Sequence, residues 1–157
     1  MRKPYAEFTR TLPAEADTLA LGRALAAGLT PGLVIYLIGE LGAGKTTLAR
    51  GLLRGLGFEG RVKSPTFTLV EVYEDSRIYL YHFDFYRFTA STELGEAGFR
   101  EYFNPQSVCL VEWPEKAAGL PAADLSIELL VAGSGRTVTI FADSEAGATC
   151  LKRCTMT

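Results

Sequence analysis

A glycine-rich segment in the first third of the chain has the residue types and spacing of a phosphate-binding loop. It reads Gly39-Glu40-Leu41-Gly42-Ala43-Gly44-Lys45-Thr46 and matches G-x-x-x-x-G-K-[ST] at every fixed position. Glycines let the backbone wrap so that successive N–H groups point at phosphate oxygens, and the following helix adds its positive end. In such a loop the lysine reaches the β- and γ-phosphates and the hydroxyl binds Mg²⁺. The segment from Gly39 to Thr47 therefore predicts a site for a nucleoside triphosphate with Mg²⁺.

Two carboxylates at predicted strands could complete this chemistry. Glu112 ends an apolar strand, and Asp84 lies in the string Tyr81-His82-Phe83-Asp84-Phe85-Tyr86-Arg87, in which His82, Asp84 and Tyr86 share one strand face. A nucleotide hydrolase needs an acidic group at the end of a neighbouring strand to hold Mg²⁺ or orient water. We predict Lys45, Asp84 and Glu112 as catalytic residues, and Thr46, Asp84 and Glu112 as metal ligands. How Asp84 and Glu112 divide these roles stays open.

Other residues near these motifs have two readings. The hydroxyls of Ser64 and Thr66 could sense the γ-phosphate, as switch segments do, or the Ser-Pro pair could simply form a turn. His82 is more often a packed strand residue than a proton shuttle, and Trp113 more often core or platform than chemistry. The only asparagine, Asn104, is not in an Asn-Lys-x-Asp segment that would read guanine, so adenine is favoured and ATP is the expected nucleotide.

The elements that must position these residues alternate between strand and helix. Hydrophobic periodicity predicts helices over 13–29, 45–56 and 91–103, buried strands over 33–38 and 108–113, and hairpins of 66–73 with 78–88 and of 125–131 with 136–141. Two buried strands between helices favour an α/β fold, and the hairpins favour a sheet with both parallel and antiparallel strands. We predict a P-loop NTPase-like three-layer sandwich with a mixed sheet.

Composition narrows the class of protein. The chain has 157 residues, 48% of them hydrophobic and 22% charged, and a net charge of −2. This predicts one P-loop ATPase domain over residues 1–157, with the tail after about residue 143 unassigned. Its longest apolar stretch, 33–38, is too short to span a bilayer. No apolar run follows the basic first residues, so they do not form a signal peptide. We therefore expect a cytoplasmic location without membrane contact. The charge does not indicate direct binding of nucleic acid.

Several strings in the same order give the chain a close resemblance to the TsaE family, the bacterial ATPases of tRNA threonylcarbamoyladenosine biosynthesis. They are residues 39–47 (GELGAGKTT), 62–71 (VKSPTFTLVE), 82–87 (HFDFYR) and 110–114 (LVEWP). The resemblance covers about residues 12–142, and Phe67 and Phe85 replace the family's usual Tyr and Leu with other bulky apolar side chains.

The resemblance implies a function and assigns residues to it. It implies an ATPase that works with the two subunits of the bacterial threonylcarbamoyl transferase complex, and through them on the tRNA adenosine next to the anticodon. Thr46 and Glu112 would bind Mg²⁺, Asp84 would act in hydrolysis, and the segments of Ser64–Thr66 and Asp84 would be switches. The resemblance also places Glu15 and Arg136 by the nucleotide.

Two other functions suit the same loop. A small-molecule kinase would need an acceptor pocket and an arginine-bearing lid, for which no insertion is long enough. A nucleotide-gated binding module would bind ATP without useful hydrolysis. We expect instead an Mg²⁺-dependent ATP hydrolase that is weak alone and stimulated by its partners, because no arginine is obviously placed to stabilise the transferred phosphoryl group.

Overall fold

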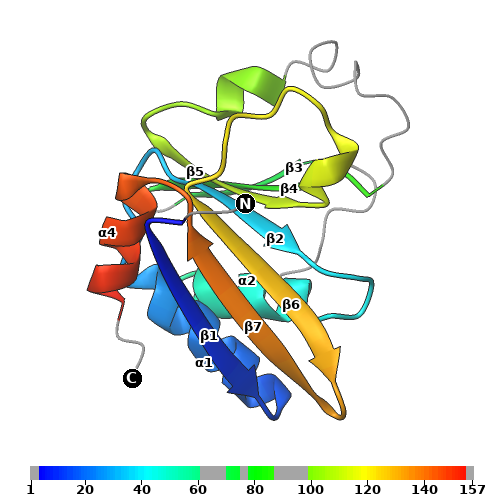
Figure 1. Cartoon of the computed structure of the whole chain (residues 1–157). Helices are drawn as coiled ribbons and strands as arrows, with labels where there is room; N and C mark the ends of the chain where they lie inside the picture. Colours follow the sequence, from blue (N-terminus) through cyan, green and yellow to red (C-terminus); the bar gives the residue numbers. More distant parts are fainter. Residues whose placement is uncertain (1–3, 61–69, 75–77, 87–98, 155–157) are drawn as a thin grey trace.

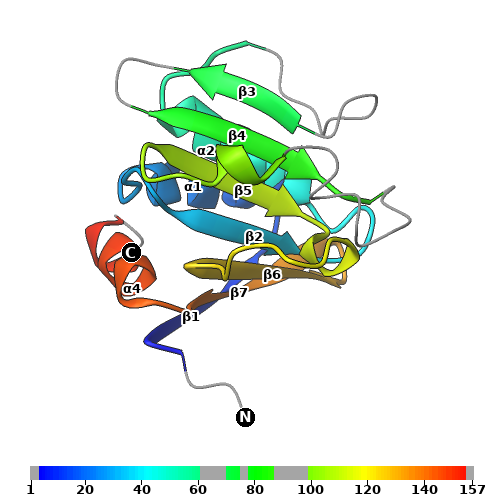
Figure 2. The ribbon, with the colours of Figure 1, turned by 90° about the horizontal axis from the view of Figure 1, so that it is seen from above.

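The computed structural model describes residues 4–60, 70–74, 78–86 and 99–154. In these residues seven strands form one sheet in the order β1-β7-β6-β2-β5-β4-β3, which can be followed from β1 to β3 in Figures 1 and 2. The elements are β1 (Ala6–Leu12), α1 (Glu15–Ala26), β2 (Val34–Ile38), α2 (Lys45–Gly55), β3 (Val70–Glu74), β4 (Tyr79–Asp84), η1 (Phe99–Tyr102), β5 (Ser107–Glu112), η2 (Pro114–Lys116), β6 (Leu125–Ala132), β7 (Gly135–Ala142) and α4 (Glu145–Arg153).

The sheet is mixed, as predicted. Strands β6, β2, β5 and β4 run parallel to one another, whereas β1, β7 and β3 pair antiparallel with their neighbours. The described parts of the two predicted hairpins are β3–β4 and β6–β7; residues 66–69 and 87–88 of the first prediction lie outside the described residues. The second turns at Gly133, whose φ of 59° is the positive value that a two-residue hairpin turn requires at its first position. Parallel strands place their carboxyl ends at one edge of the sheet, where α/β proteins bind ligands.

Apolar side chains cover both faces of the sheet. On one face, Leu80, Leu110 and Ile35 pack with α1 and α2, which lie side by side behind β1, β7 and β6 in Figure 1. On the other face, Phe83 and Val111 pack under the segment that contains η1 and η2. The strands β2 and β5 read as continuous apolar runs because both of their faces are covered. The expected α/β fold is therefore present, and in the described residues its third layer consists of short 3₁₀ segments and loops.

Two glycines allow α1 and α2 to pack with their backbones in contact. A Cβ added to Gly22 would lie 2.4 Å from the carbonyl oxygen of Leu48, and one added to Gly51 would lie 2.3 Å from that of Leu19. Only glycine, which has no Cβ, lets the two helix backbones approach this closely. Because α2 begins at Lys45, this packing also sets the position of the predicted phosphate-binding loop.

One strand and one α-helix of the structure lie outside the predicted elements, as does the short 3₁₀ segment η2. Strand β1 pairs along its length with β7, and α4 follows β7 in the tail, where Ser144 caps it by accepting a hydrogen bond from the Gly147 N–H. Of the helix predicted over 91–103, residues 91–98 lie outside the described part and Phe99–Tyr102 is a 3₁₀ turn. None of the helices in the described ranges is long and apolar enough to cross a membrane.

Candidate functional site

The predicted loop joins the carboxyl end of β2 to the first turn of α2. Gly42 and Gly44 have φ values of 79° and 105°, in the left-handed region that side chains with a Cβ disfavour. Gly44 is the residue before α2, and its carbonyl accepts from the Leu48 N–H as the helix begins. The side chain of Ala43 is buried beneath the loop. The sequence pattern therefore stands in the strand–loop–helix setting that a phosphate site needs.

The ammonium of Lys45 lies between the loop and an aromatic ring. Its Nζ donates a hydrogen bond to the Gly39 carbonyl, and it stands 3.9 Å from the centroid of the Trp113 ring. Only 6% of Lys45 is exposed, and this burial lowers its pKa, while the Glu112 and Asp84 carboxylates oppose the shift. A cation surrounded by dipoles, a π face and two carboxylates remains charged without full hydration.

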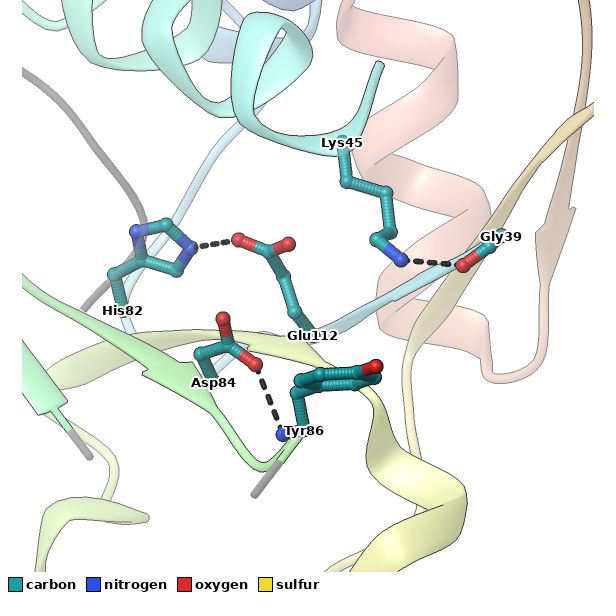
Figure 3. Close-up of polar contacts among 6 residues, drawn as sticks. All are labelled: Gly39, Lys45, His82, Asp84, Tyr86 and Glu112. Carbon is teal, nitrogen blue, oxygen red and sulfur yellow. Dashed lines mark hydrogen bonds and ion pairs between the residues drawn. The ribbon is translucent and has the colours of Figure 1, made fainter. Parts of the chain in front are cut away.

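The two predicted carboxylates lie opposite each other on neighbouring parallel strands. Asp84 of β4 pairs in register with Glu112 of β5, and both point to the side of the sheet that carries the loop (Figure 3). The Oδ1 of Asp84 accepts a hydrogen bond of 2.9 Å from the Tyr86 N–H. Burial raises the pKa of Asp84; this hydrogen bond lowers it and the Glu112 carboxylate raises it further. The two carboxylates are therefore near enough for Glu112 to disfavour the charged form of Asp84.

Glu112 also has a buried partner on β4. Its Oε2 lies 2.6 Å from Nε2 of His82, and the two side chains are 3% and 0% exposed. Figure 3 shows the Glu112 side chain between His82 and Lys45. This contact restricts the orientation of the Glu112 carboxylate.

A cavity of about 680 Å³ opens between the loop and these carboxylates. Of the predicted site residues it is lined by Glu15, Leu41, Gly42, Gly44, Lys45, Thr46, Thr47, Asp84, Glu112 and Arg136. Gly39 and Ala43 belong to the back of the loop, and Glu40 is exposed on it. Ser64 and Thr66 lie outside the described residues. The structure thus gathers most of the predicted site around one cavity.

Arg136 and Glu15 border the cavity through different contacts. The Arg136 guanidinium donates from Nε to the Ala43 carbonyl at 3.0 Å, from Nη2 to that of Gly42 at 2.9 Å and from Nη1 to that of Gly135 at 2.8 Å. It therefore ties β7 to the loop. Glu15 accepts from Arg50 at 2.7 Å, an exposed ion pair at the rim.

Sequence reasoning did not assign Trp113 and Tyr86 to the site. Their rings lie 4.9 Å apart at 49°, both line the cavity, and the ammonium of Lys116 lies 5.1 Å from the Tyr86 centroid. Trp113 adopts φ 57° and ψ 50°, which turns the chain sharply between β5 and Pro114. The sequence did contain an indication of each residue: Tyr86 shares the strand face of Asp84, and Trp113 directly follows Glu112.

The donors around the cavity suit Mg²⁺ and a triphosphate. A threonine hydroxyl and two carboxylates are hard oxygen ligands, and Mg²⁺ sites commonly use one or two carboxylates together with substrate phosphates. No group of three or more His, Cys, Asp or Glu that could hold a metal occurs in the described residues. The cavity also has the volume typical of small-molecule sites.

Known proteins are similar over most of the chain. The family model described as "Threonylcarbamoyl adenosine biosynthesis protein TsaE" matches residues 12–138. The tRNA threonylcarbamoyladenosine biosynthesis protein TsaE of Haemophilus influenzae is 43% identical over 89% of this chain and 92% of its own length. That of Bacillus subtilis is 43% identical over 80% of this chain and 78% of its own. The crystal structure of Bacillus subtilis YdiB has a TM-score of 0.77 and 32% identity, over 94% and 93% of the two chains. The chain belongs to the TsaE family, which acts in the biosynthesis of threonylcarbamoyladenosine in tRNA.

Proposed function

We propose that this protein binds ATP with Mg²⁺ in the cavity of about 680 Å³ and hydrolyses it to serve threonylcarbamoyl modification of tRNA. One observation carries the proposal: Lys45 and Thr46, at the start of α2, line the same cavity as Asp84 and Glu112, at the ends of β4 and β5. A cation and a hydroxyl on one wall and two carboxylates on the other are the groups that triphosphate hydrolysis requires.

Each residue has a role that follows from its place. Lys45 binds the β- and γ-phosphates, so its ammonium leaves the Gly39 carbonyl when they arrive. Thr46 and Glu112 would hold Mg²⁺, which when bound would neutralise charge at the phosphate oxygens. Asp84 orients the attacking water at its carboxylate, and the raised pKa of that carboxyl brings it closer to the range of an effective proton acceptor.

The partners in this proposal are the two subunits of the bacterial threonylcarbamoyl transferase complex, in the cytoplasm, with tRNA contacted through them. Among the described residues, the arginine that lines the cavity is Arg136, and its guanidinium already donates to three backbone carbonyls. An arginine supplied by a partner can raise the rate of P-loop hydrolysis by about 10³–10⁵. Hydrolysis by this protein alone is therefore slow, and the partners accelerate it.

The test measures release of phosphate and ADP by the protein alone, with the transferase pair, and with the pair and tRNA. The proposal expects Mg²⁺-dependent ADP and phosphate in equal amounts, faster with the pair. A phosphorylated metabolite in place of free phosphate would indicate a kinase. ATP binding without any release in the full mixture would indicate a nucleotide-gated binding module. Equal turnover with and without the pair would contradict partner stimulation.

A further inference from the structure

His82 is a buried polar side chain that the proposed mechanism leaves without a role. On β4, Leu80, His82 and Asp84 face the same side of the sheet: Leu80 is in the core, and Asp84 lines the cavity. His82 stands between them and is 0% exposed. A leucine there would extend the apolar layer, so the imidazole needs a physical explanation.

The explanation lies on the neighbouring strand. His82 pairs in register with Leu110, which puts Glu112 two residues further along β5 on the same face. Because a carboxylate oxygen accepts, the contact of 2.6 Å is an Nε2–H donated by His82 to Oε2 of Glu112. The other ring nitrogen, Nδ1, is buried and finds no hydrogen-bond partner among the residues that the structure describes. The imidazole is thus held in the core by its Nε2 contact with Glu112, and burying a polar group with an unpaired atom is unfavourable unless that contact serves a purpose.

We propose that His82 is a positioning residue that holds the Glu112 carboxylate in the orientation needed to bind Mg²⁺; this inference rests on the proposed function. The hydrogen bond fixes Oε2 on the side away from Lys45, and a charge-assisted bond between buried groups is stronger than an exposed one. Groups that hold a metal ligand in this way typically change metal affinity or activity by about 10–100-fold when replaced.

The experiment compares two substitutions of matched size. His82→Met fills the space without a donor, whereas His82→Gln places an amide nitrogen near the position of Nε2. Calorimetry measures binding of a non-hydrolysable ATP analogue over a range of Mg²⁺ concentrations and in EDTA. Affinity in EDTA reports whether the site is intact, because it does not involve the metal. His82→Asn, whose amide is too short to reach Glu112, serves as a second donor-removing variant if His82→Met does not fold.

The inference predicts that His82→Met raises the half-saturating Mg²⁺ concentration by about 10–100-fold without changing affinity in EDTA, and that His82→Gln recovers most of the loss. In a Glu112→Gln background, His82→Met should add no further change, because the two residues act as one unit.

Two results overturn the inference alone: a normal Mg²⁺ response in His82→Met, or a shift that persists in full when Glu112 is already Gln. If Mg²⁺ does not change the affinity of the wild-type protein for the analogue, the proposed metal site is wrong, and this inference is wrong with it.

Discussion

At the scale of single residues, the site consists of charges that are removed from water and balanced by one another. Lys45 is 6% exposed and Glu112 is 2% exposed, and the Glu112 carboxylate opposes the lowering of the Lys45 pKa that burial causes. Groups of this kind are costly to bury unless they are paired. A ligand that carries both signs of charge can pair with these buried groups and so gain binding free energy. A phosphate chain with a divalent cation is such a ligand.

Lys45→Ala should abolish tight nucleotide binding. It removes the cation that faces the phosphates and leaves Asp84 and Glu112 without their neighbour, a loss of about 2–5 kcal/mol for one partner of a buried charge pair. Isothermal calorimetry with ATP measures it. Lys152→Ala is the matched control, because Lys152 is exposed on α4, away from the cavity. Wild-type affinity in Lys45→Ala would remove the lysine from the site.

Asp84→Asn should lower the rate of ATP hydrolysis while leaving the affinity for ATP largely unchanged. The amide oxygen can still accept from the Tyr86 N–H, so the end of β4 keeps its geometry, but it can no longer take a proton. Loss of a general base typically lowers turnover by about 10²–10⁴. Phosphate release and ATP affinity, measured side by side, check this. Lost affinity with normal residual turnover would reverse the assignment.

In Mg²⁺-free buffer, the effect of Asp84→Asn on the free energy of unfolding should depend on pH. Because burial raises the pKa of Asp84, the folded protein holds this proton more tightly than the unfolded chain, and stability falls as the pH rises through the raised pKa. Asp84→Asn removes the titration, so it should raise the free energy of unfolding at neutral pH, with the gain shrinking toward the ordinary aspartate range. Urea unfolding at several pH values measures the gain. A gain that is equal at every pH would contradict the shift.

The sequence predicted the residues of the loop because their pattern is local: glycines, lysine and threonine act within eight positions. It did not predict contacts that depend on strand register. The bond between His82 and Glu112 joins residues 30 positions apart, and the bond from Arg136 to Gly42 joins residues 94 apart. Glu112 and Asp84 were found because strand ends in α/β proteins are known places for such groups, yet only the register shows that they face each other.

At the scale of elements, the loop is held from two directions. Helix α2 begins directly after it and is packed tightly on α1 through Gly22 and Gly51. From the other side, Arg136 at the start of β7 donates to the carbonyls of Gly42 and Ala43. These two contacts fix the loop before a ligand arrives, so less conformational freedom is lost on binding.

Arg136→Ala should loosen the loop and weaken nucleotide binding. Hydrogen bonds to a charged group are worth about 1.5–3 kcal/mol each, and part of that loss should appear in the affinity for ATP. Arg136→Lys should recover only a fraction, because an ammonium lacks the planar fork that reaches two carbonyls at once. Arg23→Ala, on the exposed side of α1, is the control for loss of one arginine. Unchanged affinity for ATP in Arg136→Ala would show that the loop binds the nucleotide without the hydrogen bonds from Arg136.

Gly51→Ala should destabilise the protein although alanine favours helices. Its Cβ would lie 2.3 Å from the Leu19 carbonyl oxygen, so α1 and α2 must move apart. Overpacking of this kind typically costs about 1–3 kcal/mol. Urea unfolding measures the change, with Gly60→Ala as control, because a Cβ on Gly60 would meet nothing within 4 Å. Equal stability of the Gly51 variant would mean that the helices can adjust freely.

Helices and strands with clear periodicity were predicted, and β1 and α4 were not. β1 is half-exposed along its length and is stabilised by β7, which lies at the other end of the chain. α4 is short and contains Gly147 and Thr149, so its propensity is low; its position depends on contacts to Asp124, whose carboxylate accepts from the Ser144 hydroxyl that caps the helix. Long-range pairing and capping of this kind leave little trace in a local pattern.

At the scale of the whole molecule, the topology brings the chemistry to one edge of the sheet. β2, β4 and β5 are parallel, so the loop after Ile38, the carboxylate of Asp84 and that of Glu112 meet at their carboxyl ends. The β6–β7 turn and the start of α1 close the cavity from the opposite side. Segments from across the chain therefore contribute to one site, and the family model likewise matches residues 12–138 and is not confined to the loop.

The most direct test of this account is a crystal structure of the protein with a non-hydrolysable ATP analogue and Mg²⁺. The account predicts the triphosphate within the loop of residues 39–47, Lys45 moved from the Gly39 carbonyl to the β- and γ-phosphates, and Mg²⁺ on Thr46 and Glu112 with Asp84 facing the γ-phosphate. An analogue bound elsewhere, or a loop without phosphates in which Lys45 still donates to Gly39, would contradict it.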